Sequence, residues 1–208
     1  MDTPSIIKTI PNFHEFRFKE KGSLFIGQTY NVTSEVGAEI QLKKIKKEYY
    51  DATHRCFSIT LIDGTFKYSD DGEPNGTAGI RIFNAQKHFE VTNNLTVVIR
   101  YFGGTKLGVG PLGKAYYDSA FSVLKEAKIV SLKKFQRLEI EYNFEQSSFV
   151  HNMIRKYGIK IISSTFNPSP KINGYIVFEN LLNFRSEIEQ YSPQSIHFIF
   201  YEEFQYFE

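Results

Sequence analysis

An acidic loop near the middle of the chain holds the residues best suited to chemistry. Residues 69–79 read Ser-Asp-Asp-Gly-Glu-Pro-Asn-Gly-Thr-Ala-Gly, which places Asp70, Asp71 and Glu73 close together. Carboxylates this close can bind a hard cation or serve as acid and base. The loop lacks the ligand spacing of a calcium-binding loop, which ends on a glutamate. Asp and Gly also form turns, and an aspartate or Thr77 can cap a following helix.

A second glycine-rich loop imitates two nucleotide-binding motifs. Residues 108–115 read Gly-Val-Gly-Pro-Leu-Gly-Lys-Ala, which fits both G-x-G-x-x-G and the start of a P-loop. A P-loop needs a hydroxyl group after its lysine to hold magnesium, and Ala115 has none. Pro111 also removes a backbone donor that would face phosphate. We therefore disfavour both nucleotide motifs and expect only an anion site, where a helix begins near Lys106 and Lys114.

Two strands carry further polar candidates. His54 and Cys56 are two residues apart in a predicted strand and so share a face, as a nucleophilic pair would. Cysteine is among the most often buried residue types, which favours a thiol in the core. Arg100 interrupts an apolar strand. A buried arginine needs a partner, and the three carboxylates of the acidic loop are the candidates.

Periodicity and turn residues predict the elements that position these side chains. In order they are a hairpin around a turn at residues 19–23, a helix capped by Thr33 or Ser34, a strand at 54–62, a short helix at 80–88, a strand at 95–102 and a helix starting at Pro111. The run 95–102 is nearly all apolar, which is typical of a central strand covered on both faces. The lysines of the first helix, at 43, 44, 46 and 47, fit a solvated face or contacts with phosphate.

The last third of the chain has a different order of predicted elements. The pattern predicts a strand, helix, strand, strand, helix and strand at residues 138–144, 145–157, 159–166, 175–178, 181–191 and 196–204. That order is the split βαβ, ferredoxin-like plan. We therefore predict an α+β protein of two domains, residues 1–132 and 133–208.

The composition is that of an ordinary globular chain. Of 208 residues 41% are hydrophobic, and 25 Lys plus Arg against 23 Asp plus Glu leave a formal net charge of +2. This balance gives no whole-chain electrostatic reason to expect nucleic acid or a membrane as partner. A single cysteine excludes an internal disulfide and a thiolate-rich zinc site. With no apolar run of ~18 residues and no signal-peptide layout, we expect a cytoplasmic protein.

Three segments together resemble the YigZ/IMPACT family. They are Asp-Ala-Thr-His-Arg-Cys at 51–56, the acidic loop at 69–79, and Arg-Tyr-Phe-Gly-Gly-Thr-Lys-Leu-Gly at 100–108. The resemblance covers residues 14–130 and implies a fold like the second domain of small-subunit ribosomal protein S-five. For the remainder it implies a ferredoxin-like domain similar to domain five of elongation factor G. Relatives of this family in eukaryotes act in translational control.

The chain departs from the family pattern at three positions. Leu24 stands where the hairpin string of the family has an arginine, which weakens anion binding by the hairpin. Pro111 and Gly113 replace a glycine and an aliphatic residue. These two changes create the apparent nucleotide motif, which supports its being accidental.

The resemblance favours a non-enzymatic, translation-associated regulator that binds RNA or the ribosome, without a cofactor and without specificity for DNA. Its candidate binding face consists of His54, Arg55, Asp70, Asp71, Glu73, Arg100, Lys106 and Lys114. The alternative is a metal- or phosphate-dependent hydrolase or phosphotransferase that uses the acidic loop. A third hypothesis is a protein-interaction adaptor with contacts on the aromatic strand at 198–207. The sequence does not determine the ligand or the oligomeric state. It also does not show whether the two glycine-rich loops form one site.

Overall fold

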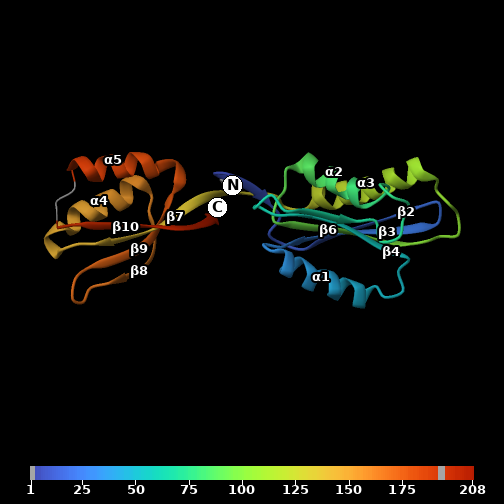
Figure 1. Ribbon diagram of the computed structural model, residues 1–208, viewed down its shortest axis with the longest axis horizontal. Coiled ribbons are helices and arrows are strands. Elements are labelled where there is room, and N and C mark those ends of the chain that lie inside the picture. The colour runs from blue at the N-terminus through green and yellow to red at the C-terminus, as the bar shows by residue number, and fades with distance from the viewer. Residues whose placement is uncertain (1–2, 192–194) are drawn as a thin grey trace. The chain divides into compact units, whose positions relative to one another are not determined.

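The computed structural model describes residues 3–191 and 195–208, which fall into two compact units. One unit contains residues 7–131, and the other contains residues 132–208 together with 4–6. The described residues form five α-helices and two five-stranded sheets, so the architecture is α+β, as the sequence predicts (Figure 1). None of these helices is long and apolar enough to cross a membrane.

The first unit is built on an antiparallel sheet. Its strands, in spatial order, are β2 (His14–Glu20), β3 (Ser23–Asn31), β6 (Asn94–Tyr101), β4 (His54–Thr60) and β5 (Phe66–Ser69). The central strand is β6, in which every residue except the last is buried. This confirms the central strand predicted from the apolar run.

Helices cover both faces of this sheet. Helix α1 (Glu35–Glu48) lies on one face, and helices α2 (Gly79–Phe89) and α3 (Val109–Glu126) lie on the other (Figure 1). Successive residues of a strand point to opposite faces. Val97 of β6 therefore packs in the α1 core, and Val98 packs in the core beneath α2 and α3.

Local sequence signals set the ends of several elements. The β2–β3 turn has positive φ at Lys21 (45°) and Gly22 (82°), as a tight two-residue hairpin turn requires. Ser34 caps α1 by accepting a hydrogen bond from the Gly37 N–H at 3.1 Å. Helix α3 starts before Pro111, which lies in the first turn, where a missing N–H breaks no helical hydrogen bond.

The second unit follows the predicted order of elements. It contains β7 (Val130–Glu141), α4 (Ser147–Tyr157), β8 (Lys160–Thr165), β9 (Lys171–Val177), α5 (Leu181–Tyr191) and β10 (His197–Phe207), with 3-10 turns at 144–146 and 178–180. The sheet order is β10-β7-β9-β8, and β1 (Ile6–Thr9) also pairs with β7. Both α4 and α5 cover the same face of this sheet (Figure 1).

Several boundaries differ from those expected from the sequence. Strand β7 ends at Glu141 rather than residue 144, and β9 begins at Lys171 rather than Tyr175. The start of β9 was not predicted, because Gly174 interrupts the apolar pattern and was interpreted as a turn residue. A side chain there would lie 2.8 Å from the Lys160 carbonyl oxygen of β8. Strands β1 and β5 were not predicted, and β5 shows no alternation of buried and exposed residues.

Candidate functional site

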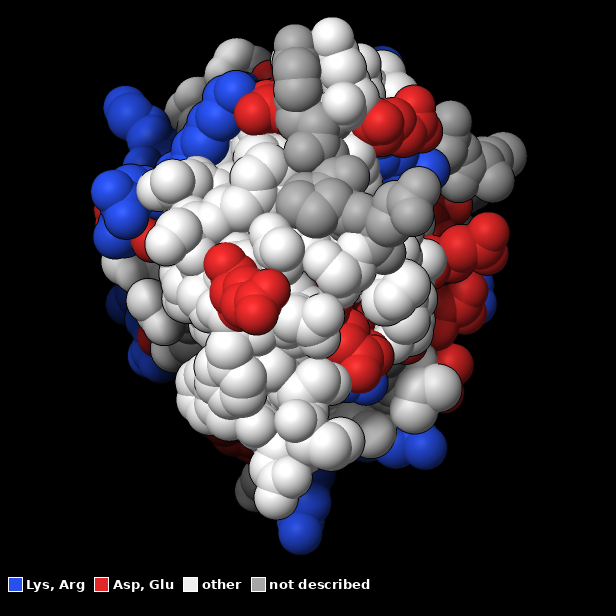
Figure 2. Space-filling view, turned by 90° about the vertical axis from the view of Figure 1, so that its left-hand side faces the viewer, with Lys and Arg blue, Asp and Glu red and all other residues white. Residues whose placement is uncertain are grey.

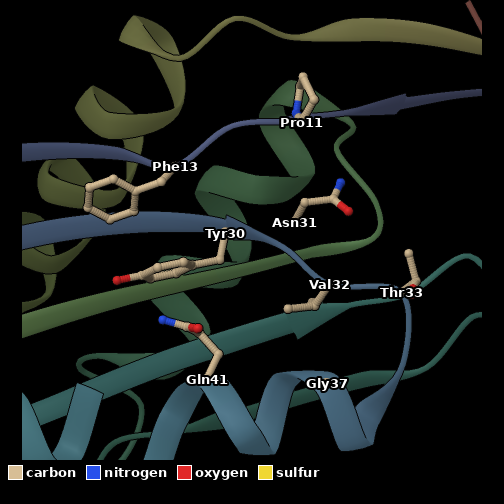
Figure 3. Close-up of a pocket in the computed structure, with 8 residues that line it drawn as sticks. All are labelled: Pro11, Phe13, Tyr30, Asn31, Val32, Thr33, Gly37 and Gln41. Atoms are coloured by element: carbon tan, nitrogen blue, oxygen red, sulfur yellow. The ribbon is translucent and has the colours of Figure 1, made fainter. Parts of the chain in front are cut away.

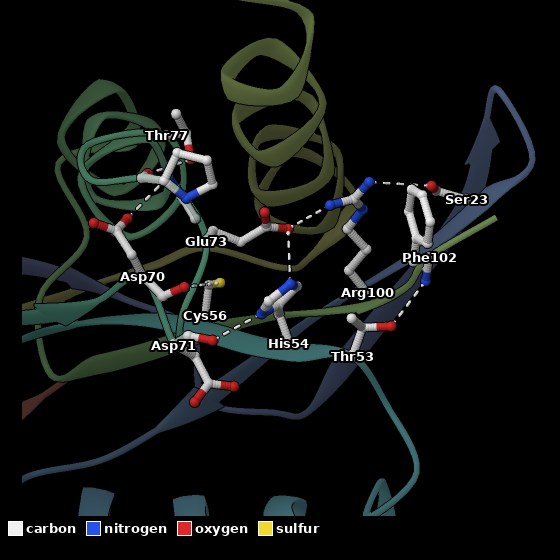
Figure 4. A network of polar contacts seen from close by, with 12 residues as sticks. Ser23, Thr53, His54, Cys56, Asp70, Asp71, Glu73, Thr77, Arg100 and Phe102 are labelled. Atoms are coloured by element: carbon white, nitrogen blue, oxygen red, sulfur yellow. Dashed lines mark hydrogen bonds and ion pairs between the residues drawn. The ribbon is translucent and has the colours of Figure 1, made fainter. Parts of the chain in front are cut away.

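The three family motifs meet at one end of the first sheet. In the strand register, His54 of β4 lies beside Arg100 of β6, which lies beside Phe25 of β3. The acidic loop at 69–79 follows β5, and the loop at 102–108 leaves β6. Segments that are far apart in the sequence therefore form one site (Figure 4).

Arg100 is the buried centre of this site. Its Nη1 donates to Glu73 Oε1 at 2.6 Å, and its Nη2 lies 3.3 Å from the Ser23 hydroxyl oxygen (Figure 4). The guanidinium carbon lies 5.5 Å from the ring centre of Phe25 and 5.4 Å from that of Phe102. Only 5% of Arg100 is exposed. The acidic loop therefore supplies the predicted partner, and it is Glu73.

Glu73 receives a second donor from helix α3. The Tyr116 hydroxyl group donates to Glu73 Oε1 at 2.7 Å, and His54 Nε2 lies 3.8 Å from the same oxygen. Burial raises the pKa of Tyr116, and the neighbouring Cys56 and Glu73 raise it further, so the phenol stays neutral. The carboxylate at Oε1 is thus held by one cation and one neutral donor. Its other oxygen, Oε2, has no hydrogen-bond partner among the described residues.

Asp70 organises the acidic loop. One of its oxygens accepts from the backbone N–H groups of Ala78 at 3.0 Å and Gly79 at 2.8 Å, and the other accepts from Gly76 at 2.9 Å. It therefore satisfies donors at the start of α2, where a negative charge is favourable. Thr77, the other predicted cap, instead donates its hydroxyl to the Pro74 carbonyl oxygen at 2.6 Å.

Asp71 ties the acidic loop to β4. Its Oδ2 accepts from the Arg55 backbone N–H at 2.7 Å and lies 3.5 Å from Arg55 Nε. The Asp71 carbonyl oxygen lies 2.8 Å from His54 Nδ1, and a carbonyl can only accept, so Nδ1 carries the proton. Gly72 follows with φ of 87° and completes the turn.

The three carboxylates do not converge on a shared point. Asp70 binds backbone amides, Asp71 binds Arg55, and Glu73 binds Arg100. Among the described residues, no group of three or more His, Cys, Asp or Glu side chains is placed to hold a metal ion. The geometry therefore gives no support to the metal-dependent alternative.

Cys56 belongs to the core. Its side chain is fully buried beneath α2 and α3, and its Sγ donates to the Asp70 carbonyl oxygen at 3.0 Å. Burial raises the pKa of the Cys56 thiol, which keeps it neutral. The interpretation as a core thiol is confirmed.

A pocket of about 370 Å³ opens beside the ion pair. Its polar wall contains Glu73, Arg100 and Lys106. The rest of its lining is formed by Pro74, Phe102, Leu107, Gly108, Val109 and Leu112. The pocket thus joins the acidic loop to the second glycine-rich loop in one site, a point that the sequence left open.

Lys114 does not line this pocket. It pairs with Asp118 one helical turn later in α3. With that partner it lines a separate hollow, next to Phe18 and Glu20 of the β2 strand. Of the residues predicted for the binding face, Lys114 therefore lies apart from the pocket, and so does Arg55, whose Nη1 donates to the Tyr49 carbonyl oxygen at the end of α1 at 3.0 Å.

The β2–β3 hairpin contributes residues that the sequence reasoning missed. A Cβ atom at Gly103 would lie 1.9 Å from the carbonyl carbon of Gly22, so the two backbones touch. Ser23 accepts a hydrogen bond from the Gly103 N–H at 3.2 Å. Lys21 is exposed beside this contact. The sequence signals for this hairpin were the turn residues Lys21, Gly22 and Ser23 and the partial match to the hairpin string of the family, and nothing in the sequence pointed to Tyr116 as a partner of Glu73.

A further hollow, of about 380 Å³, lies at the other end of β3 (Figure 3). The rings of Phe13 and Tyr30 lie 5.1 Å apart on one side of it, and Gln41 of α1 lies on another. None of the predicted site residues lines it. We therefore assign the candidate site to the pocket beside Arg100.

Comparison with known proteins identifies the family. The model of the Impact N-terminal domain matches residues 21–124, half of the chain, and this range contains all three motifs. The chain belongs to the IMPACT family. IMPACT family member YvyE of Bacillus subtilis is 32% identical over 150 residues, which cover 71% of this chain and 69% of that protein.

Other IMPACT family members match over most of their length. A member from Haemophilus influenzae is 30% identical over 85% of this chain and 88% of its own. YigZ of Escherichia coli is 24% identical over 88% of this chain and 92% of its own. A crystal structure of a hypothetical protein superposes with a TM-score of 0.67 at 22% identity, covering 96% of this chain and 99% of that one. The last match concerns the fold alone.

Proposed function

We propose that this IMPACT family member is a non-enzymatic, translation-associated regulator that binds RNA or the ribosome in the cytoplasm. Family membership supports a role in translational control. The buried ion pair supports a binding role, because Arg100 and Glu73 neutralise each other and hold the strand and the acidic loop together at the pocket wall. No cofactor enters this proposal.

The proposal includes a domain assignment. Residues 1–132 are the domain like domain two of ribosomal protein S-five, and residues 133–208 are a ferredoxin-like domain like domain five of elongation factor G. The compact units and the strand order β10-β7-β9-β8 support this reading, because that order is the one a split βαβ arrangement gives. Both parent folds belong to components of the translation machinery, which is an argument from analogy.

The observation that carries the proposal is the contact between Gly22 and Gly103, with exposed lysines on both sides. Lys21 precedes this contact in the hairpin, and Lys106 follows it in the loop. Lysine side chains beside exposed glycine backbone give phosphates positive charge with little steric obstruction. Arg100 cannot serve in this way, because it is buried and paired with Glu73. We therefore assign phosphate contacts to Lys21 and Lys106.

The face of the protein shown in Figure 2 carries little positive charge for a polyanion such as RNA. Among the residues that the structure describes, uncharged side chains cover most of this face, some Asp and Glu lie within it, and Lys and Arg lie towards its margins. A low density of positive charge disfavours phosphate binding there, which supports placing the contact surface at the motif loops.

Fluorescence anisotropy with a labelled RNA stem-loop tests the proposal. We expect affinity to fall as salt rises from low to physiological concentration, because bound lysines release counterions. The double variant Lys21→Ala/Lys106→Ala should lower the slope of log affinity against log salt by about two, one for each lost phosphate contact. The control is Lys43→Ala/Lys46→Ala, which removes two exposed lysines of α1. RNA binding that does not depend on salt, or an equal loss in both double variants, would contradict the proposed surface.

A further inference from the structure

The pocket beside Arg100 combines an apolar lining with one free acceptor. Pro74, Phe102, Leu107, Val109 and Leu112 form the apolar part of its lining. A volume of about 370 Å³ is within the range of sites that hold a small ligand. Such a lining favours a flat, largely apolar group over a bare ion.

The acceptor is the carboxylate of Glu73. Its side chain is 4% exposed, and Oε1 is occupied by Arg100 and Tyr116. Oε2 has no hydrogen-bond partner among the described residues, and Glu73 lines the pocket. Oε2 is not among the buried atoms that lack a hydrogen-bond partner, so it is open to the pocket, and a ligand that offers an N–H group can bind it there.

Positive charge and an aromatic ring lie at the same pocket. Lys106 is exposed and belongs to the lining. The pocket also includes Gly108 and Val109, where α3 begins without a capping side chain, so free N–H groups favour an anion there. Phe102 is 45% exposed and can stack against a planar ring.

We propose that this pocket binds a single unstacked guanine nucleotide. Its base lies against Phe102 and donates to Glu73 Oε2, and its phosphate lies toward Lys106 and the start of α3. The inference rests on the proposed function only for the source of the nucleotide, which is either a residue of a bound RNA strand or a free mononucleotide. Single-stranded RNA is commonly recognised by bases that leave the stack and lie on aromatic side chains.

The free carboxylate oxygen favours guanine, the base that offers it two donors, and disfavours uracil most. Guanine presents two adjacent donors, the ring N1–H and the exocyclic amino group, so a carboxylate faces no competing lone pair. Adenine and cytosine each place an acceptor nitrogen beside their amino group. Uracil places carbonyl oxygens on both sides of its single N–H, and these oxygens repel a carboxylate. A well-made contact to a base edge discriminates by about 1–3 kcal/mol, which is roughly 5- to 150-fold.

A tryptophan reporter tests the stacking directly. The natural chain contains no tryptophan, so Phe102→Trp gives one fluorophore in the pocket. We expect guanosine monophosphate to quench it saturably, with an affinity at least about fivefold higher than that of uridine monophosphate. Phe144→Trp, at a 62% exposed position of the second unit, is the control and should show no saturable quenching.

Two further arms separate the sources of the nucleotide and test the pocket itself. An oligouridine strand with one central guanosine is compared with the same strand without it, by the quenching each causes in the Phe102→Trp protein.

The second experiment uses Val109→Trp, which fills the pocket mouth and should abolish the preference for guanosine in a labelled-strand assay. Val36→Trp is its matched control, because Val36 is 66% and Val109 is 68% exposed and each lies in the first turn of a helix.

The outcomes separate this inference from the proposed function. Saturable quenching by the monophosphate assigns the pocket to free nucleotides, and quenching only by the guanosine-containing strand assigns it to RNA. Equal responses to guanine and uracil, or no saturable response to either form of guanine, overturn the inference. Salt-sensitive binding of the RNA stem-loop can persist in that case, and then the proposed function stands without a base pocket.

Discussion

Glu73 and Arg100 matter most at the scale of single residues. Their side chains are 4% and 6% exposed, and Tyr116 adds a neutral donor to the same carboxylate. The sequence predicted that Arg100 needs a carboxylate from the acidic loop, but it could not choose among three. The choice depends on the path of that loop, because Asp70 turns toward the backbone of α2 and Asp71 toward Arg55.

Removing the charge of Glu73 should destabilise the first unit. Glu73→Gln leaves Arg100 buried without a charged partner, which costs about 3–5 kcal/mol in the free energy of unfolding. Asp71→Asn is the control, because the ion pair of Asp71 is partly exposed and such pairs contribute about 1 kcal/mol or less. Urea unfolding monitored by circular dichroism measures both. Similar losses of unfolding free energy in the two variants would contradict a larger contribution of the buried pair to stability.

The Cys56 thiol should make folding stability fall at alkaline pH. Its pKa is raised in the folded protein, so the folded state keeps a proton that the unfolded chain loses above about pH 9. The stability contributed by the neutral thiol is therefore complete below that pH and declines as the pH rises further. Unfolding free energies of the natural protein and Cys56→Ala, measured between neutral pH and pH 10, should converge. A constant difference between the two would contradict the buried, neutral thiol.

At the scale of elements, the contact between the β2–β3 hairpin and the loop after β6 fixes the site. Gly103→Ala would place a Cβ atom 1.9 Å from the carbonyl carbon of Gly22, so one of the two backbones must move. We expect a loss of about 1–3 kcal/mol in unfolding free energy, as for overpacked cores. Gly110→Ala is the control, since its added Cβ meets nothing within 4 Å and it lies in the first turn of α3. Equal stability of both variants in thermal unfolding would refute the close approach.

Most elements could be predicted from the sequence, and the two four-residue strands β1 and β5 could not. Strand β6 has a nearly all-apolar run, and helix α1 has a helical period with a serine cap. Strands β1 and β5 have four residues each, and pairing with neighbours distant in the sequence defines them. The hairpin residues Lys21 and Ser23 were missed for the same reason, because only the fold brings them to Gly103.

At the scale of the whole molecule, the near-neutral charge limits how RNA or a ribosome can be bound. A formal net charge of +2 provides little long-range attraction, so affinity must come from local positive charge at the motif loops. Lys21 and Lys106 are exposed there, and Arg100 is not. Binding by two lysines is weak and sensitive to salt, which suits a regulator that associates reversibly.

Co-sedimentation with ribosomes tests the central claim most directly. The natural protein, Lys21→Ala/Lys106→Ala and the control Lys43→Ala/Lys46→Ala are centrifuged with ribosomes and with separated subunits at low and physiological salt. We expect the natural protein and the control to pellet at low salt and to be released as salt rises, while the loop variant stays in the supernatant. Failure of the natural protein to pellet at low salt, or pelleting of the loop variant to the same extent, would contradict ribosome binding through the motif loops.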